Sequence, residues 1–211
     1  MEQIHQISCG NGNCFIISNG ETGILIDTGR EKYKQKVLNA CKQLNMRLLI
    51  LTHGHVDHIQ NAAFLSNTLN IPIAMSKLDL DLISDNTRQP LSSHGILGKI
   101  VLSASLKSFK TDIIDPFIPD VYLENGDTLN DYGINANIIS LSGHTKGSIG
   151  IDVAGHSIIA GDALMNLFYP AVSMLYNDKH ALLQSAQKIS ALGERKIYFG
   201  HGKPLDNRKW V

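Results

Sequence analysis

Short apolar runs separated by polar turns predict a chain of strands and helices arranged in two similar halves. The expected strands are residues 4–7, 14–18, 22–26, 48–51 and 71–75, then 121–123, 134–141, 148–153, 157–160 and 197–199. The expected helices are residues 31–44, 59–67, 77–83 and 178–192. Each half thus supplies a sheet with helices outside it. Two stacked sheets covered by helices on both outer faces are one layered solution for such a pattern.

The segment of residues 84–119 departs from this pattern. It contains the residues that most often interrupt helices and strands, namely Pro90, Gly95, Gly98, Pro116 and Pro119. We therefore expect an irregular segment that acts as a candidate lid. The charged residues between positions 86 and 111 are all basic: Arg88, Lys99, Lys107 and Lys110. They could contact an anionic substrate, although solvated loop charges are the more common arrangement.

The charge balance narrows the classes of partner. The chain has 19 Lys plus Arg and 19 Asp plus Glu, so its net charge is zero with neutral histidines. This balance argues against bulk electrostatic binding to nucleic acid or to an anionic membrane. No apolar run approaches the roughly 20 residues of a membrane helix. We expect a single domain over residues 1–211 that acts on a small molecule.

The cysteines and the N-terminus indicate the compartment. Cys9, Cys14 and Cys41 are odd in number and form no CxxC pair, which argues against a disulfide framework. The first residues lack the basic and apolar regions of a signal peptide. We therefore expect a cytoplasmic protein.

Candidate chemistry is concentrated in the stretch Thr52-His53-Gly54-His55-Val56-Asp57-His58, which follows a buried strand. Imidazole and carboxylate groups are common metal ligands. In extended backbone, residues two apart point the same way, so His53, His55 and Asp57 can converge on one side. His58 must then point elsewhere. One short loop can therefore supply ligands for two neighbouring metals.

Three further positions repeat one local design, in which a ligand-capable side chain lies beside glycine just after a strand. They are His144, Asp162 and His201. Ends of strands are where active sites tend to be assembled. Each position alone is a weak signal, but together with the histidine loop they form a set of five His and two Asp.

This set resembles the metallo-β-lactamase-fold superfamily, and its motif content is closest to glyoxalase-II-like hydrolases. The matching residues run from Asp27 to His201, in the family's order. The resemblance implies a four-layer αββα sandwich of two mixed β-sheets. It implies the following ligands: His53, His55 and His144 for one metal, Asp57, His58 and His201 for a second, and Asp162 as a bridge. It also implies that Asp27 supports a ligand from behind.

The ligand charges favour hydrolysis. Two divalent cations with two carboxylates and neutral imidazoles leave a site near +2, which stabilises hydroxide at neutral pH. The hypothesis is a dinuclear zinc hydrolase that uses a metal-bridging hydroxide on a small, anionic ester, thioester or lactone. Asp57 would take the nucleophile's proton, as the resemblance suggests. Iron and manganese also accept such ligands, and Lys146 and Tyr169 are candidate substrate contacts.

Several alternatives remain open. Similar folds include a mononuclear iron sulfur dioxygenase and phosphodiesterases, and a non-catalytic binding module is a third possibility. The resemblance to secreted β-lactamases would require Cys or Ser in place of Asp162, which disfavours that activity. Signal-lactone hydrolases carry a Tyr three residues beyond the bridging Asp, where this chain has Met165.

Overall fold

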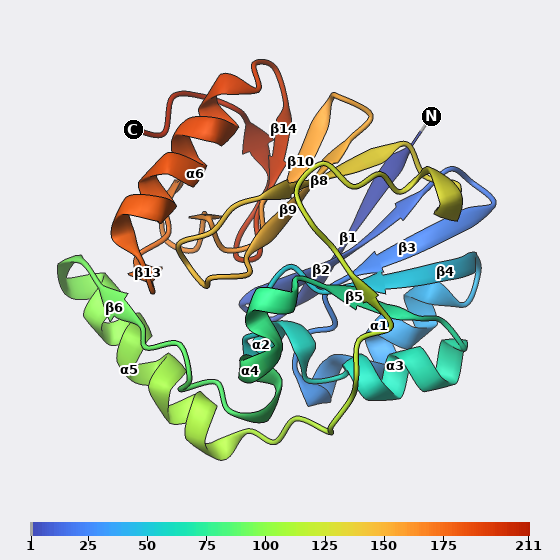
Figure 1. The fold of residues 1–211 in the computed structure, drawn as a ribbon, viewed down its shortest axis with the longest axis horizontal. Coiled ribbons are helices and arrows are strands. Elements are labelled where there is room, and N and C mark those ends of the chain that lie inside the picture. The colour runs from blue at the N-terminus through green and yellow to red at the C-terminus, as the bar shows by residue number, and fades with distance from the viewer. Residues whose placement is uncertain (1) are drawn as a thin grey trace.

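Two β-sheets stack face to face in the computed structural model, which describes residues 2–211 (Figure 1). The six-stranded sheet has the order β1-β2-β3-β4-β5-β7. Its strands are β1 Gln3–Cys9, β2 Gly12–Ser18, β3 Thr22–Ile26, β4 Asn45–Ile50, β5 Ile73–Met75 and β7 Val121–Tyr122. The five-stranded sheet has the order β15-β14-β10-β9-β8. Its strands are β8 Ala136–Ser140, β9 Ile149–Val153, β10 Ser157–Ile159, β14 Lys196–Tyr198 and β15 Leu205–Asp206. Both sheets mix parallel and antiparallel pairs.

Helices cover the outer faces. The helices are α1 Lys34–Cys41, α2 Val56–Ile59, α3 Ala62–Leu69, α4 Leu80–Ser84, α5 Gly95–Thr111 and α6 Lys179–Ala191. Short 3₁₀ turns at Glu31–Tyr33 and Lys77–Asp79 lead into α1 and α4, and a third covers Asn130–Tyr132. Side chains of α1 and α3 pack on the outer face of the first sheet, and those of α6 pack on the second. The expected αββα sandwich is thereby confirmed.

The central core lies between the two sheets. Phe15, Ile26 and Ile50 of the first sheet meet Ile138 and Ile151 of the second, and all five are buried. The buried strands read as nearly continuous apolar runs because both of their faces are covered. At the start of α6, the Asp178 carboxylate accepts hydrogen bonds from the backbone N–H groups of His180 and Ala181 and so acts as the N-cap of the helix.

The expectation of an irregular segment over residues 84–119 is wrong in its centre. Helix α5 runs for 17 residues from Gly95 to Thr111, and the short strand β6, Ser92–Ser93, precedes it. Only Gly98 and Ser108 of α5 are buried, so the helix has no continuous apolar face turned to a core. For this reason its sequence lacks the periodic apolar pattern that marks most helices. Two glycines near its start also indicate a loop rather than a helix. The flanking prolines lie outside it.

Smaller elements complete the chain. The two-stranded pairs are β11 Leu164–Met165 with β12 Ala171–Val172, and β13 Leu175–Tyr176 with β6. The helix expected over residues 59–67 corresponds to α3, and the separate short helix α2 precedes it. All three cysteines are free thiols, as expected. Within residues 2–211, no helix combines the length and apolar character that a membrane span requires.

Candidate metal centre

Seven side chains from four separate segments converge where the ends of both sheets meet. The loop after β4 carries His53 and His55, helix α2 directly after it carries Asp57 and His58, and the loops after β8, β10 and β14 bring His144, Asp162 and His201. Three groups of these residues each place their potential ligand atoms within 4.8 Å of one another. The groups are His53, His55 and His144; His53, His58 and Asp162; and Asp57, His58 and His201. The sequence-based set is therefore spatially one cluster.

The first group consists of three buried imidazoles. His55 Nδ1 lies 3.0 Å from His144 Nε2, and the rings of His53 and His144 meet edge to face at 4.9 Å between centroids. Burial lowers the pKa of His53 and of His55 well below the ordinary value, and the neighbouring histidines lower both further. These imidazoles are therefore neutral at physiological pH, the form that binds a metal.

Carboxylates surround the two remaining histidines, His58 and His201. Asp162 Oδ2 lies 3.2 Å from His201 Nε2 and 3.6 Å from His144 Nε2, and Asp162 Oδ1 lies 3.6 Å from His58 Nε2. Asp162 thus sits between the two histidine groups. Burial alone would lower the pKa of His58, but Asp27, Asp162 and Asp57 outweigh it and raise that pKa to about 10. Burial is likewise outweighed at His201, where Asp162 leads the effects that raise the pKa to about 9.

Asp27 fixes one of the imidazoles from behind. Its Oδ2 atom accepts from His58 Nδ1 and from Thr52 Oγ1, both at 2.8 Å, and its Oδ1 atom accepts from the Thr52 backbone N–H. Because the Thr52 hydroxyl donates its proton to Asp27, its oxygen accepts a hydrogen bond from His53 Nδ1, 3.1 Å away. Nε2 of His53, and that of His58 once its ring is neutral, is then left as an acceptor facing the cluster. Asp27 achieves this with φ of 58°, a conformation that is uncommon outside glycine.

Backbone carbonyls orient two more imidazoles. His144 Nδ1 donates to the Leu175 carbonyl at 2.9 Å, and His201 Nδ1 donates to the Asn11 carbonyl at 2.8 Å. In the neutral form of both rings the proton is held on the outer nitrogen, so Nε2 can offer its lone pair to the centre. This arrangement is the one that metal-binding histidines need.

The centre of the cluster contains buried polar atoms without hydrogen-bond partners. Within residues 2–211, four buried atoms there have no hydrogen-bond partner: His53 Nε2, His55 Nε2, His58 Nε2 and Asp162 Oδ1. Leaving one such polar atom unpaired costs about 1–3 kcal/mol, so four together require a compensating group. Converging lone pairs of nitrogen and oxygen are satisfied by cations, and the residues present fit divalent metal ions.

Gly200 leaves the space that this cluster needs. A Cβ atom at this position would lie 2.1 Å from Asp162 Oδ1 and 3.0 Å from His58 Cε1. No side chain fits there unless a ligand residue moves. The glycine before His201 is therefore a steric requirement of the site.

Asp79 is a structural link that the sequence-based interpretation missed. Its fully buried carboxylate accepts from Gly54 N at 3.0 Å, Thr145 Oγ1 at 2.7 Å, Gly147 N at 2.7 Å and Gln89 Nε2 at 3.1 Å. It thereby joins the loop of His53 and His55 to the loop of His144. Its sequence context, a short turn after β5, contains no recognisable signal.

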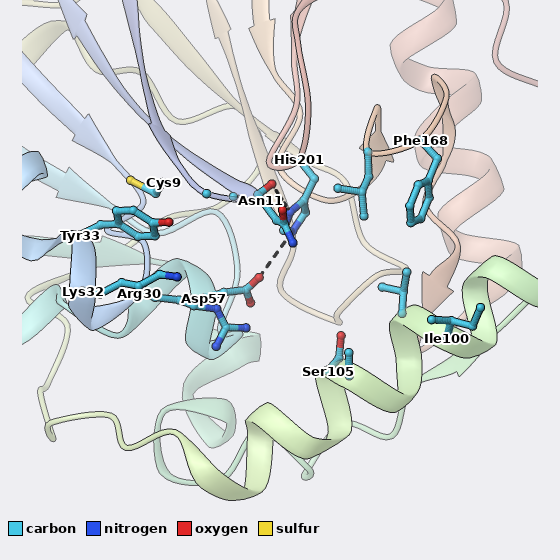
Figure 2. A pocket seen from close by; sticks show the side chains of 15 residues that line it. Cys9, Asn11, Arg30, Lys32, Tyr33, Asp57, Ile100, Ser105, Phe168 and His201 are labelled. Atoms are coloured by element: carbon cyan, nitrogen blue, oxygen red, sulfur yellow. Dashed lines mark hydrogen bonds and ion pairs between the residues drawn. The ribbon is translucent and has the colours of Figure 1, made fainter.

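Two cavities open beside the cluster. The inner one has a volume of about 60 Å³ and is bounded by five of the clustered residues and by an apolar shell. That shell is Leu91, Val101, Phe109, Met165, Leu167 and Leu175. The outer one has a volume of about 460 Å³ and reaches Asp57 and His201 (Figure 2). Helix α5 supplies a wall to both cavities, and its Phe109 ring stacks on His55 with 4.9 Å between centroids.

The residues expected to contact substrate lie elsewhere. Lys146 is exposed and lines a separate surface cavity with Ser76 and Leu123. Tyr169 is 52% exposed and lines neither cavity beside the cluster, although its neighbour Phe168 lines the outer one. Basic residues do reach the outer cavity, but they are Arg30 and Lys32, directly after the Asp27-Thr28-Gly29 turn. Their position shortly after the end of a strand could have marked them as candidates from the sequence alone.

Comparison with known proteins identifies the family. The family model of the metallo-beta-lactamase superfamily matches residues 7–201, and the chain belongs to that superfamily. A hydroxyacylglutathione hydrolase, GloC, of Haemophilus influenzae is 26% identical over 95% of this chain and 90% of its own length. An uncharacterised Aquifex aeolicus protein is 27% identical over 72% of this chain and 65% of its own length.

Solved structures show the same fold. The BLEG-1 B3 metallo-beta-lactamase superposes with a TM-score of 0.76 at 21% identity, over 97% of this chain and 94% of that one. A di-iron-bound form of the protein TTHA1623 gives a TM-score of 0.68 at 24% identity, also over 97% of this chain and 94% of that one.

Proposed function

We propose that this protein is a dinuclear metal-dependent hydrolase that holds two zinc ions and cleaves a small ester, thioester or lactone. The observation that carries the proposal is the cluster of four buried nitrogen and oxygen atoms without hydrogen-bond partners, where the groups of candidate ligands meet. His53, His55 and His144 would hold one ion, and Asp57, His58 and His201 the other. Asp162, which lies between the groups, would bridge them.

Two bound divalent cations would supply activation of water and polarisation of the attacked carbonyl oxygen. The chain itself supplies a proton acceptor. Burial raises the pKa of Asp57, but His58 and His201 outweigh this effect and hold the pKa below its ordinary value. Asp57 also lines both cavities, so its ionised carboxylate can take the proton from the attacking water.

The surroundings protect this chemistry from bulk water. The inner cavity is bounded by six apolar side chains as well as by the clustered residues. Exclusion of water strengthens the electrostatic interactions inside such a site. Helix α5 lines this cavity with the side chains of Val101, Ser105 and Phe109. We therefore assign α5 the role of a fixed cover, in place of the irregular lid.

The names of two relatives support a thioester as the substrate. The Haemophilus influenzae protein is named a hydroxyacylglutathione hydrolase, and so is a Vibrio vulnificus protein that is 25% identical over 98% of this chain. A β-lactamase activity is disfavoured by the sequence at Asp162. A mononuclear iron oxygenase would use a single metal, whereas the trio of Asp57, His58 and His201 is complete here.

Metal analysis coupled to a substrate panel tests the proposal. Protein reloaded with zinc and freed of loose metal should contain two zinc ions per chain, and His201→Ala should contain about one. His180→Ala, which alters an exposed histidine on α6, should retain two. Thioesters, lactones and phosphodiesters are then compared by kcat/KM. A stoichiometry of one or less in the wild-type protein, or cleavage of phosphodiesters alone, would contradict the proposal.

A further inference from the structure

The outer cavity has two walls of opposite character. One wall carries Arg30, Lys32 and Tyr33, and the other carries Ile100 and Val101 of α5 with Leu167 and Phe168. Figure 2 shows the two walls on either side of Asp57 and His201, with the Lys32 side chain directed towards Asp57. A substrate that reaches the clustered residues through this cavity must touch both walls.

The basic wall contains two cations, of which one forms an ion pair at the end of α5 and the other forms none in the described part of the chain. Arg30 Nη1 donates to Ser108 Oγ at 2.8 Å and forms an ion pair with Asp112, so α5 already holds the guanidinium in place. Lys32 makes no ion pair within residues 2–211, and its ammonium lies 5.0 Å from the centroid of the Tyr33 ring. The free positive charge that faces the cavity is therefore that of Lys32.

The apolar wall is exposed without an internal partner. Ile100 is 60% exposed and Phe168 is 55% exposed, although both are large apolar side chains. Neighbouring exposed apolar groups beside a cavity are typical of a ligand-binding surface. An apolar stretch of ligand placed between them would remove this area from water.

The two cavities differ greatly in size. The inner cavity, about 60 Å³, accommodates roughly two water-sized groups, since one water occupies about 30 Å³ of liquid volume. The outer cavity is about 460 Å³. The part of a substrate that extends from the scissile bond past Asp57 and His201 can therefore be long, while the part beside His55 and His144 must be short.

We propose that Lys32, positioned with Arg30 and Tyr33, binds the anionic end of an amphipathic leaving group whose apolar stretch lies against α5 and Phe168. The substrate class is then an ester or thioester with a short acyl group and a leaving group that has both an apolar chain and a terminal anion. This inference rests on the proposed hydrolase function for the reaction, but the binding subsite can be measured separately.

Matched substrates and variants test the subsite. The thioacetates of 6-mercaptohexanoate and of hexanethiol share the acyl group and chain and differ in the terminal carboxylate. Wild-type zinc-loaded protein should favour the anionic thioester by about fivefold in kcat/KM, the range expected of a partly exposed ion pair. Lys32→Gln should abolish this preference, mainly by raising KM for the anionic thioester. Lys42→Gln, at an exposed lysine just after α1, should keep the preference.

A binding measurement separates this inference from the proposed function. Hexanesulfonate and hexanol are titrated calorimetrically into the wild-type protein, Lys32→Gln, Lys42→Gln and Ile100→Ser. Hexanesulfonate binding should weaken about fivefold in Lys32→Gln and also weaken in Ile100→Ser, but not in Lys42→Gln. If this holds while no ester, thioester or lactone is cleaved, the subsite stands and the hydrolase proposal falls. If thioesters are cleaved but Lys32→Gln behaves as Lys42→Gln towards both ligands, the subsite is overturned.

Discussion

The Oδ2 atom of Asp27 lies 2.8 Å from Nδ1 of His58, and both side chains are only 1% exposed. Asp27 comes from the end of β3, whereas His58 belongs to α2. This buried pair sets the imidazole tautomer that points Nε2 at Asp57 and Asp162. The geometry of the second ligand group therefore depends on a residue outside that group.

Replacement of Asp27 by Asn should weaken the second metal selectively. The amide cannot accept the three hydrogen bonds on the same two oxygens, so His58 loses its fixed tautomer and part of its basicity. Loss of such a supporting carboxylate typically lowers metal affinity about 10–100-fold. Competition with a chromogenic zinc chelator measures the two affinities. The control is Asp131→Asn at an exposed carboxylate, and equal affinities in both variants would refute the assigned role.

Zinc binding should release protons in proportion to the raised histidine pKa values. The pKa of His58 is about 10 and that of His201 is about 9 in the metal-free protein, so both are imidazolium at pH 8. A metal ligand must be neutral, and binding therefore expels these protons. We expect at least two protons per chain in weakly buffered solution with an indicator dye. His201→Ala should release fewer, and zinc binding by the wild-type protein without proton release would contradict the raised pKa values of the two histidines.

Replacement of Gly200 by Ala should disturb the site through steric overlap. The added methyl group would overlap Asp162 Oδ1, which must move or push His58 aside. Overpacking of this kind typically costs ~1–3 kcal/mol. We expect a lower Tm and fewer than two zinc ions per chain. Gly98→Ala in α5, where the new Cβ meets its neighbours at an ordinary 3.4 Å, serves as the control and should retain both ions.

Replacement of Asp79 by Ala should uncouple the two loops that form the first ligand group. Four donors, including the backbone N–H groups of Gly54 and Gly147, would lose their buried acceptor. Each unsatisfied buried group costs about 1–3 kcal/mol, and entry of water would offset part of the total. Denaturant unfolding of metal-free protein should show a loss of several kcal/mol by this principle. A stability equal to that of Asp131→Ala would show that Asp79 is not a structural link.

The sequence predicted the sandwich and the clustered residues because both depend on local patterns. Buried strands read as apolar runs, and the seven clustered residues follow strand ends beside recognisable glycines or histidines. Helix α5 escaped prediction because its apolar side chains face a cavity and solvent rather than a core. Asp79 escaped because its importance comes from groups that lie far away in the sequence, such as Thr145 and Gly147.

The basic residues illustrate a similar limit. Lys146 was a candidate because it lies close to His144 in the sequence, but the chain folds so that Arg30 and Lys32 line the outer cavity. Which charges reach a site depends on the three-dimensional course of loops. Composition over a segment carries no such information.

We propose that one metal ion lies within each of the two groups of candidate ligands. Anomalous diffraction from zinc-loaded crystals, recorded on both sides of the zinc absorption edge, tests this arrangement most directly. We expect two peaks, one among His53, His55 and His144 and one among Asp57, His58 and His201, with Asp162 between them. A single peak, or peaks away from these side chains, would contradict it.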